Sequence, residues 1–132
     1  MDERVDLVHR YFDLWLHGDA DRVDALVTSD YIDHNKSEWA PGGADLKAEV
    51  REFHAAFSDV RGQVEEVLPD GEWVAFRATL DALQTEVFRG MPPGERLVLH
   101  GIEMLRIEGG RIAELWGNEE TLKRYPQLRS AL

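Results

Sequence analysis

The sequence predicts an α+β fold in which N-terminal helices pack on one face of a mainly antiparallel sheet. Apolar residues recur at helical spacing up to residue 57, and from residue 60 onward they alternate with polar residues as in strands. A run of helices followed by a run of strands is typical of this class. The chain has 132 residues, 43% of them hydrophobic, so we predict a single domain over residues 1–132 with one core.

Three helices are predicted before any strand. Residues 3–17 and 44–57 carry apolar stripes at helical spacing, and a short helix capped by Asp19 lies between them. Gly18 ends the first helix, and Pro41-Gly42-Gly43 breaks the chain before the third. The stripes contain Val5, Val8, Phe12, Trp15 and Leu16, then Val23, Leu26 and Val27, then Leu46, Val50, Phe53 and Phe57.

Two hairpins are predicted after the helices. The first joins residues 60–68 to residues 73–83 through a turn at residues 69–72. The second joins residues 96–107 to residues 111–117, and its turn holds Gly109 and Gly110, which can take the positive φ angles that tight turns need. The segment between the hairpins is rich in Gly and Pro and is expected to be irregular.

Composition excludes several classes of function. The net charge is −11, from 26 acidic and 15 basic residues, so we expect no binding to nucleic acid or to an anionic membrane. There is no cysteine, and the sequence has no metal-binding, nucleotide-binding or dinucleotide-binding motif, so we expect no metal and no cofactor. The N-terminus is acidic where a signal peptide is basic, and we expect a cytoplasmic protein.

Four stretches of the chain resemble the SnoaL-like polyketide cyclases, a family within the superfamily that has the cone-shaped fold of nuclear transport factor 2. The stretches are RYFDLWLHGDADRVDALVTSDYIDHN, FHAAFSDV, DGEWVAFRATL and FRGMPPGERLVLHGIEMLRIEGGRIAELW. The resemblance implies a strongly curved sheet that encloses one deep, mostly apolar pocket with the helices. It also implies that the YIDHN segment, the third helix and the last two strands line this pocket, and that the protein forms a homodimer through the outer face of the sheet.

The resemblance implies one catalytic residue directly. The family's cyclases carry an acidic residue four positions after the tryptophan of the final strand, and use it for proton transfer in an intramolecular aldol closure. Here the tryptophan is Trp116 and the matching residue is Glu120, where the family usually has Asp. Burial would raise the pKa of Glu120 toward neutrality, whereas a solvated Glu in the first turn of a terminal helix would have no catalytic role.

Two histidines are further catalytic candidates. A neutral His34 facing the pocket would hydrogen-bond a substrate carbonyl or enolate, although an imidazole that ties down the turn is an equal alternative. Asp33 then points the other way and is expected to act as a cap or to face water. His100 shares one strand face with Ile102, Met104 and Arg106, and the opposite face carries Leu99, Gly101, Glu103 and Leu105; the sequence leaves open which set faces the pocket.

The predicted substrate-binding residues are mostly aromatic, because large apolar rings build pocket walls. Trp39 is a candidate lid, and His54, at the edge of an apolar stripe, is more often a core or boundary residue than a catalyst. The full set is Trp15, Trp39, Phe53, His54, Phe57, Phe88, Met104 and Trp116.

The predicted function is cofactor-independent acid/base catalysis on an apolar metabolite that bears a carbonyl group, in a polyketide cyclase or isomerase. The alternative is a domain of the same fold that binds a small molecule or has a structural role, without turnover. A third possibility, hydration or epoxide opening, would need acidic and basic groups around a water, for which Arg77 and Asp81 are candidates.

Overall fold

The computed structural model describes residues 2–36 and 38–117. Its helices are α1 (Glu3–His17), the 3-10 helix η1 (Ala20–Arg22), α2 (Val23–Leu26) and α3 (Ala44–Ala56). Its strands are β1 (Val27–Asp33), β2 (Phe57–Asp70), β3 (Trp73–Gln84), β4 (Arg96–Glu108) and β5 (Arg111–Trp116).

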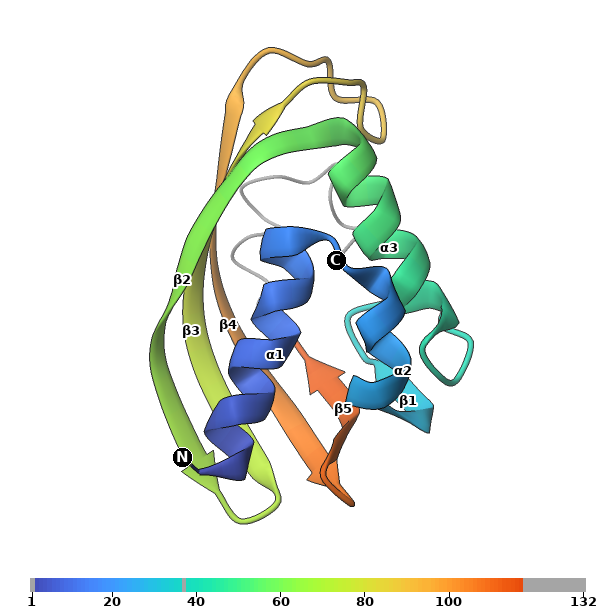
Figure 1. Ribbon diagram of the computed structural model, residues 1–132, viewed down its shortest axis with the longest axis vertical. Helices are drawn as coiled ribbons and strands as arrows, with labels where there is room; N and C mark the ends of the chain where they lie inside the picture. Colours follow the sequence, from blue (N-terminus) through green and yellow to red (C-terminus); the bar gives the residue numbers. More distant parts are fainter. Residues whose placement is uncertain (1, 37, 118–132) are drawn as a thin grey trace.

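The strands form one open, mixed sheet in the order β1-β5-β4-β3-β2. Neighbouring strands from β2 to β5 are antiparallel, and β1 runs parallel to β5. The long strands bend around α1, and α2 and α3 lie on the open side of the curve (Figure 1). This arrangement confirms the predicted α+β class and the cone-shaped fold.

Local signals account for the two ends of α1 and for the β4–β5 turn. Asp2 caps α1, because its side chain accepts a hydrogen bond from the Arg4 backbone N–H at 2.8 Å, and Gly18 ends the helix with φ 75°. In the β4–β5 turn, Gly109 and Gly110 have φ 58° and 78°, as the prediction required. The segment between β3 and β4 is irregular, with a single isolated pairing of Phe88 with Met91.

The prediction that three helices precede every strand is wrong. Strand β1 lies between α2 and α3 and contains the YID part of the YIDHN segment. Its pairing with β5 matches Ile32 with Glu114 and Asp33 with Leu115. These partners are about eighty residues apart in the sequence, and periodicity within a short window does not reveal so distant a pairing.

The core divides into two clusters of buried side chains. The larger one lies between α1, α2 and the concave face of the sheet, and includes Leu7, Val8, Tyr31 and Leu105, none more than 1% exposed. Full burial of a leucine or valine side chain contributes about 1.5–3 kcal/mol to the stability of the folded state. The smaller cluster joins the end of α3 to the irregular segment, and contains Phe53, Ala56, Phe57, Ala82, Phe88, Met91 and Leu97.

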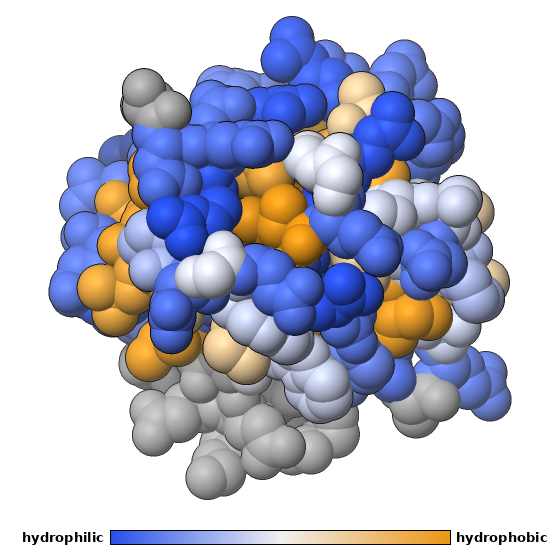
Figure 2. Space-filling model, turned by 90° about the horizontal axis from the view of Figure 1, so that it is seen from below, coloured by the Kyte–Doolittle hydropathy of each residue, from blue (hydrophilic) through white to orange (hydrophobic). Residues whose placement is uncertain are grey.

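The surface is mostly polar, as the net charge leads one to expect. In the view of Figure 2, hydrophilic residues cover most of the face, and apolar residues show in a gap near its centre. In the part of the chain that the structure describes, no helix combines the length and the apolar character needed to cross a membrane.

Candidate functional site

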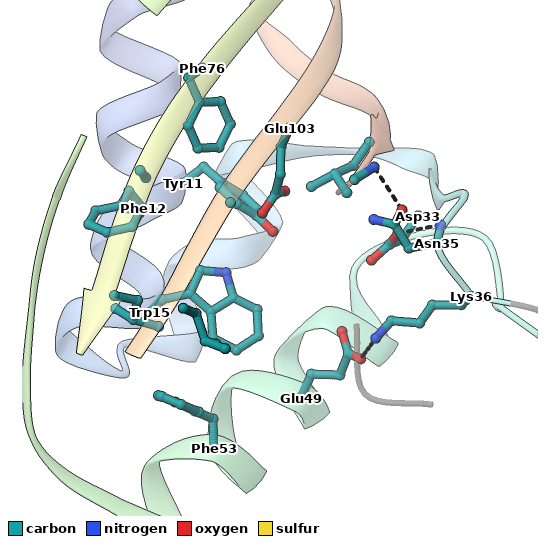
Figure 3. Close-up of a pocket in the computed structure, with 16 residues that line it drawn as sticks. Tyr11, Phe12, Trp15, Asp33, Asn35, Lys36, Glu49, Phe53, Phe76 and Glu103 are labelled. Atoms are coloured by element: carbon teal, nitrogen blue, oxygen red, sulfur yellow. Dashed lines mark hydrogen bonds and ion pairs between the residues drawn. The ribbon is translucent and has the colours of Figure 1, made fainter. Parts of the chain in front are cut away.

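A pocket with a volume of about 120 Å³ lies between the concave face of the sheet and helices α1 and α3 (Figure 3). Aromatic side chains from the two helices form one wall, and residues of β3 and β4 form the floor. A polar end is contributed by the segment after β1 and by α3. The lining residues are Tyr11, Phe12, Trp15, Asp33, Asn35, Lys36, Glu49, Phe53, Phe76, Ala78, Leu80, Leu99, Gly101, Glu103, Leu115 and Gly117.

Strand alternation decides which residues reach the floor. On β3 these are Phe76, Ala78 and Leu80, and the register places Glu103, Gly101 and Leu99 of β4 opposite them, in that order. Side chains on a strand point alternately to its two faces. The set containing Glu103 therefore faces the pocket, and the set containing His100 lies on the outer face, which resolves the choice that the sequence left open.

Glu103 is the most perturbed acid of the site. Burial raises the pKa of its carboxyl group from 4.5 to about 8, and the nearby Asp33 carboxylate adds to the increase. Its Oε2 is shielded from solvent and has no hydrogen-bond partner among the described residues. The carboxyl group lies beside Tyr11 in the pocket (Figure 3). At neutral pH the Glu103 carboxyl group is therefore mostly protonated and can donate a hydrogen bond.

Asp33 also lines the pocket, so the expectation that it faces water is wrong. It is only 6% exposed, and its Oδ1 accepts a hydrogen bond from the Asn35 backbone N–H at 2.9 Å. Burial raises the pKa of the Asp33 carboxyl group, and the Asn35 hydrogen bond partly opposes this. The Asn35 side chain in turn accepts a hydrogen bond from the Gly117 backbone N–H at 2.7 Å, which ties the loop to the end of β5.

Lys36 and Glu49 form an ion pair at the polar end of the pocket. Lys36 Nζ lies 2.5 Å from Glu49 Oε2, and the two side chains are only 5% and 14% exposed. Burial raises the pKa of Glu49 to about 7, and the Lys36 ammonium group opposes the increase without cancelling it. Glu49 is thus close to half-ionised at neutral pH, as suits a group that must both accept and release a proton.

Two buried tyrosines surround the acids. Burial raises the pKa of Tyr11 and of Tyr31 well above 10, and the nearby carboxyl groups add to both increases, so both hydroxyl groups stay protonated. The Tyr31 hydroxyl group has no hydrogen-bond partner among the described residues. Tyr11 lines the pocket and supplies a second possible donor beside Glu103.

The structure directs His34 away from the pocket, which decides against the pocket-facing one of the two alternatives that the sequence left open. Its ring stacks on Trp116 at a centroid distance of 3.8 Å, and its Nε2 lies 2.8 Å from Glu114 Oε1. Glu114 also contacts Arg106, and these two partners lower its pKa. Because His34 follows the pocket-facing Asp33 directly, strand alternation sends it to the opposite face.

The other predicted residues are divided between the pocket, the core and the outer face. Trp15 and Phe53 line the pocket. The remaining predicted binding residues are not among the described residues that line it. Trp39 packs on Tyr31 and donates a hydrogen bond to the Tyr31 carbonyl oxygen at 3.1 Å, and His54 Nε2 lies 2.7 Å from the Trp15 carbonyl oxygen. Phe57 and Phe88 belong to the smaller core cluster, and Met104 and Trp116 are 40% and 44% exposed.

The outer face holds three further candidates: the histidine His100, and the residues Arg77 and Asp81 that were considered for epoxide chemistry. His100 Nδ1 lies 3.3 Å from the Thr79 hydroxyl group, which faces outward on β3. Arg77 pairs with Glu66, and Asp81 pairs with Arg96. The structure therefore does not bring Arg77 and Asp81 into the pocket. Glu120, the residue implied by the family resemblance, lies outside the described residues.

Sequence reasoning missed most of the polar groups of the pocket. Two of them had a detectable signal. Glu49 is a charged residue within the apolar stripe of α3, at helical spacing from Leu46 and Phe53. Glu103 alternates with the outward-facing residues of its strand and so belongs to the set that contains the apolar Leu99 and Leu105. Within residues 2–36 and 38–117, no three acidic or histidine side chains converge closely enough to hold a metal ion.

A second hollow, of about 410 Å³, lies beside the C-terminal half of α1 and is lined by Arg10, Asp13, Leu14, His17, Asp19, Arg22, Ala25 and Leu26. Arg22 and Asp19 pair there with side chains that are 77% and 48% exposed. Exposed ion pairs of this kind are weakly coupled and keep ordinary hydration. The pocket with the buried acids is therefore the candidate site.

Known structures share this fold. TsrD from Streptomyces laurentii has a TM-score of 0.82 at 20% identity, over 98% of this chain and 96% of that one. AclR from Streptomyces galilaeus has a TM-score of 0.77 at 26% identity, over 97% and 83%. A SnoaL-like polyketide cyclase from Agrobacterium tumefaciens has a TM-score of 0.74 at 19% identity, over 96% and 99%.

Curated proteins give no match to the chain. A family model described as SnoaL-like polyketide cyclase matches residues 5–128, from the first helix to beyond the last described strand. The match spans all of the elements that build the pocket. The chain belongs to the SnoaL-like polyketide cyclase family.

Proposed function

We propose that the pocket performs acid/base chemistry on an apolar metabolite that bears a carbonyl group, without a cofactor, as a polyketide cyclase or isomerase does. The observation that carries this proposal is the convergence of Asp33, Glu49 and Glu103 on one largely apolar cavity. Burial raises the pKa of all three carboxyl groups, and those of Glu49 and Glu103 reach about 7 and about 8. Carboxyl groups with such pKa values exchange protons readily at neutral pH.

Glu103 takes the role of hydrogen-bond donor. A protonated carboxyl group in an apolar site can donate to a carbonyl oxygen and stabilise the negative charge that develops on it. The protonated hydroxyl group of Tyr11, beside it, supplies a second donor to the same oxygen. Removing one donor of this type typically reduces the rate by about 100-fold to 1000-fold.

Glu49 takes the role of base. Its carboxylate removes a proton from the carbon next to the carbonyl group; the C–H electron pair forms a C=C bond, and the carbonyl π electrons move to the oxygen. In a cyclase the resulting enolate carbon attacks a second carbonyl carbon, whose π electrons move to its own oxygen, and that oxygen takes the proton back from Glu49. In an isomerase the proton returns to a different carbon. The Lys36 ammonium group favours the ionised form of Glu49 that this step needs.

Exchange of the protons next to a ketone tests this proposal without knowledge of the natural substrate. 2-Tetralone is incubated with the protein in D₂O, and the loss of its C1 protons is followed by NMR. The wild type is expected to exceed the buffer rate, and E103Q and E49Q to lose most of the excess. E86Q, which makes the same carboxyl-to-amide change at an exposed site, serves as the matched control. H34A is expected to retain the wild-type rate, because its ring is directed away from the pocket.

A wild-type rate equal to that of buffer would refute the catalytic proposal for this class of ketone. If 2-tetralone bound without exchange, the pocket would be that of a non-catalytic binding domain, the alternative predicted from the sequence. Glu120 remains the proton carrier that the family resemblance implies, and E120Q in the same assay separates its contribution from that of Glu49.

We also propose that the protein forms a homodimer through the outer face of the sheet. Ile102, Met104 and Trp116 are 58%, 40% and 44% exposed, and all three lie on the face opposite the pocket. Exposed apolar side chains that cluster on one face favour association with another protein surface.

A further inference from the structure

Gly101 differs from every other glycine of the chain. Of the 11 glycines, seven have a positive φ, which glycine adopts without strain. Three more, Gly43, Gly62 and Gly117, would each bring a Cβ atom to 2.7 Å or less from another atom. Gly101 has no positive φ, and a Cβ atom built on it would meet nothing within 4 Å. Neither the backbone nor the packing of the described residues requires glycine at this position.

The open space at Gly101 belongs to the pocket. Gly101 lies between Leu99 and Glu103 on the pocket-facing side of β4, and the register places Ala78 opposite it on β3. Leu80 and Leu99 flank this pair on one side, and Phe76 and Glu103 flank it on the other. Two small residues surrounded by four larger ones leave a recess in the floor, next to Glu103 on the same face of β4.

A glycine inside a strand has a cost. It orders more backbone freedom on folding than alanine does, and it contributes no side chain to packing. Where the φ angle and the surrounding space would accept alanine, the fold itself gives no reason for glycine. Close approach of a ligand is one of the reasons for which a strand glycine is kept.

We propose that Gly101 determines the size selectivity of the pocket, by leaving a recess that receives the part of the ligand next to the carbonyl group bound by Glu103. The inference rests on the proposed function to the extent that the cavity must be the ligand site. A side chain at position 101 would fill the recess and exclude larger ketones before smaller ones. Filling such a space by one carbon is expected to weaken binding of a ligand that occupies it by about 10-fold.

Two neutral ketones of different length test the inference: 2-tetralone, measured by calorimetry, and the longer 6-propionyl-2-dimethylaminonaphthalene, measured by its fluorescence. G101A is expected to weaken binding of the longer ketone by about 10-fold, G101V to weaken it further, and both to affect 2-tetralone less. A75V adds apolar volume to the outer face of β3, opposite Met104, and is the matched control, for which both affinities should stay at the wild-type level.

The thermal midpoint separates this role from a structural one. G101A is expected to raise the midpoint by about 2 °C while it weakens ligand binding, because alanine restricts the unfolded chain and its Cβ atom meets none of the described residues in the folded one. A structural role would lower the midpoint instead. If G101V does not fold, G101A alone decides the test.

Four results would overturn the inference: no binding of either ketone to the wild type, equal weakening of both ketones in G101A, unchanged binding in G101A, or an equal loss in A75V. Failure of the catalytic proposal is distinguishable from these. If E103Q exchanges 2-tetralone protons at the wild-type rate while G101A still selects against the longer ketone, the catalytic assignment fails and the role of Gly101 stands.

Discussion

Replacing Glu103 with Gln should remove a large part of the pH dependence of folding stability. The carboxyl group has an ordinary pKa of 4.5 in the unfolded chain and a pKa of about 8 in the folded protein. Between these values the folded protein holds a proton that the unfolded chain has released. Stability therefore falls as the pH rises through this window, with a slope of about 1.4 kcal/mol per pH unit for one group.

The full difference between the two pKa values corresponds to a loss of about 5 kcal/mol for the wild type over the window, at 1.36 kcal/mol per pKa unit. Below pH 4.5 the group is protonated in both states and contributes nothing to the pH dependence. Gln has nearly the same shape and cannot ionise. The stability of E103Q relative to the wild type should consequently rise by about the same amount across the window, most steeply in its middle.

Urea unfolding at a series of pH values across the window measures this difference directly. The other charged groups facing Glu103, which are Asp33, Lys36 and Glu49, are present in both proteins, so most of their own pH dependence cancels in the comparison. E86Q serves again as the control, with the same carboxyl-to-amide change at an exposed site. Parallel stability curves for E103Q and the wild type between pH 4.5 and about pH 8 would refute the assignment of a buried, protonated Glu103.

Two further predictions concern the packing of β2 and the outer face. G62A is expected to lower the free energy of unfolding by about 1–3 kcal/mol in urea titrations, since its Cβ atom would lie 2.3 Å from the Thr79 carbonyl oxygen. A stability equal to that of the wild type would contradict this close approach of β2 and β3. I102E is expected to convert a dimer into a monomer in light scattering with unchanged thermal unfolding of the monomer unit, because it places a charge on the proposed apolar interface. A monomeric wild type would rule out that interface.

Most of the secondary structure could be predicted because its signals are local. The apolar stripe of α1, the Gly18 end of that helix and the glycine pair of the β4–β5 turn each act within a few residues. The boundary between α3 and β2 was harder to predict. The helix passes into the strand at Phe57 without a loop, so one apolar residue satisfies both periodicities.

The candidate site could be predicted only in part. Trp15 and Phe53 lie on apolar helix stripes, and the stripe that faces the core also faces the pocket. The sequence left the direction of His34 open and placed Asp33 on the wrong side, because the residues of a short strand reveal that neighbours point in opposite directions but not which direction is inward. The pairing of β1 with β5 fixes that direction, and it depends on contacts far apart in the sequence.

Three helices, the two hairpins, the turn glycines, the exclusion of thiol chemistry and the family resemblance follow from the sequence alone, because each depends on residue type and short-range spacing. The tertiary structure decided which acids are buried, which strand faces enclose the cavity and how closely Lys36 approaches Glu49. The physical reason is that a carboxyl group acquires an unusual pKa only from the atoms that displace its water. For Glu103 those atoms come from segments that are distant in the chain and meet only in the folded protein.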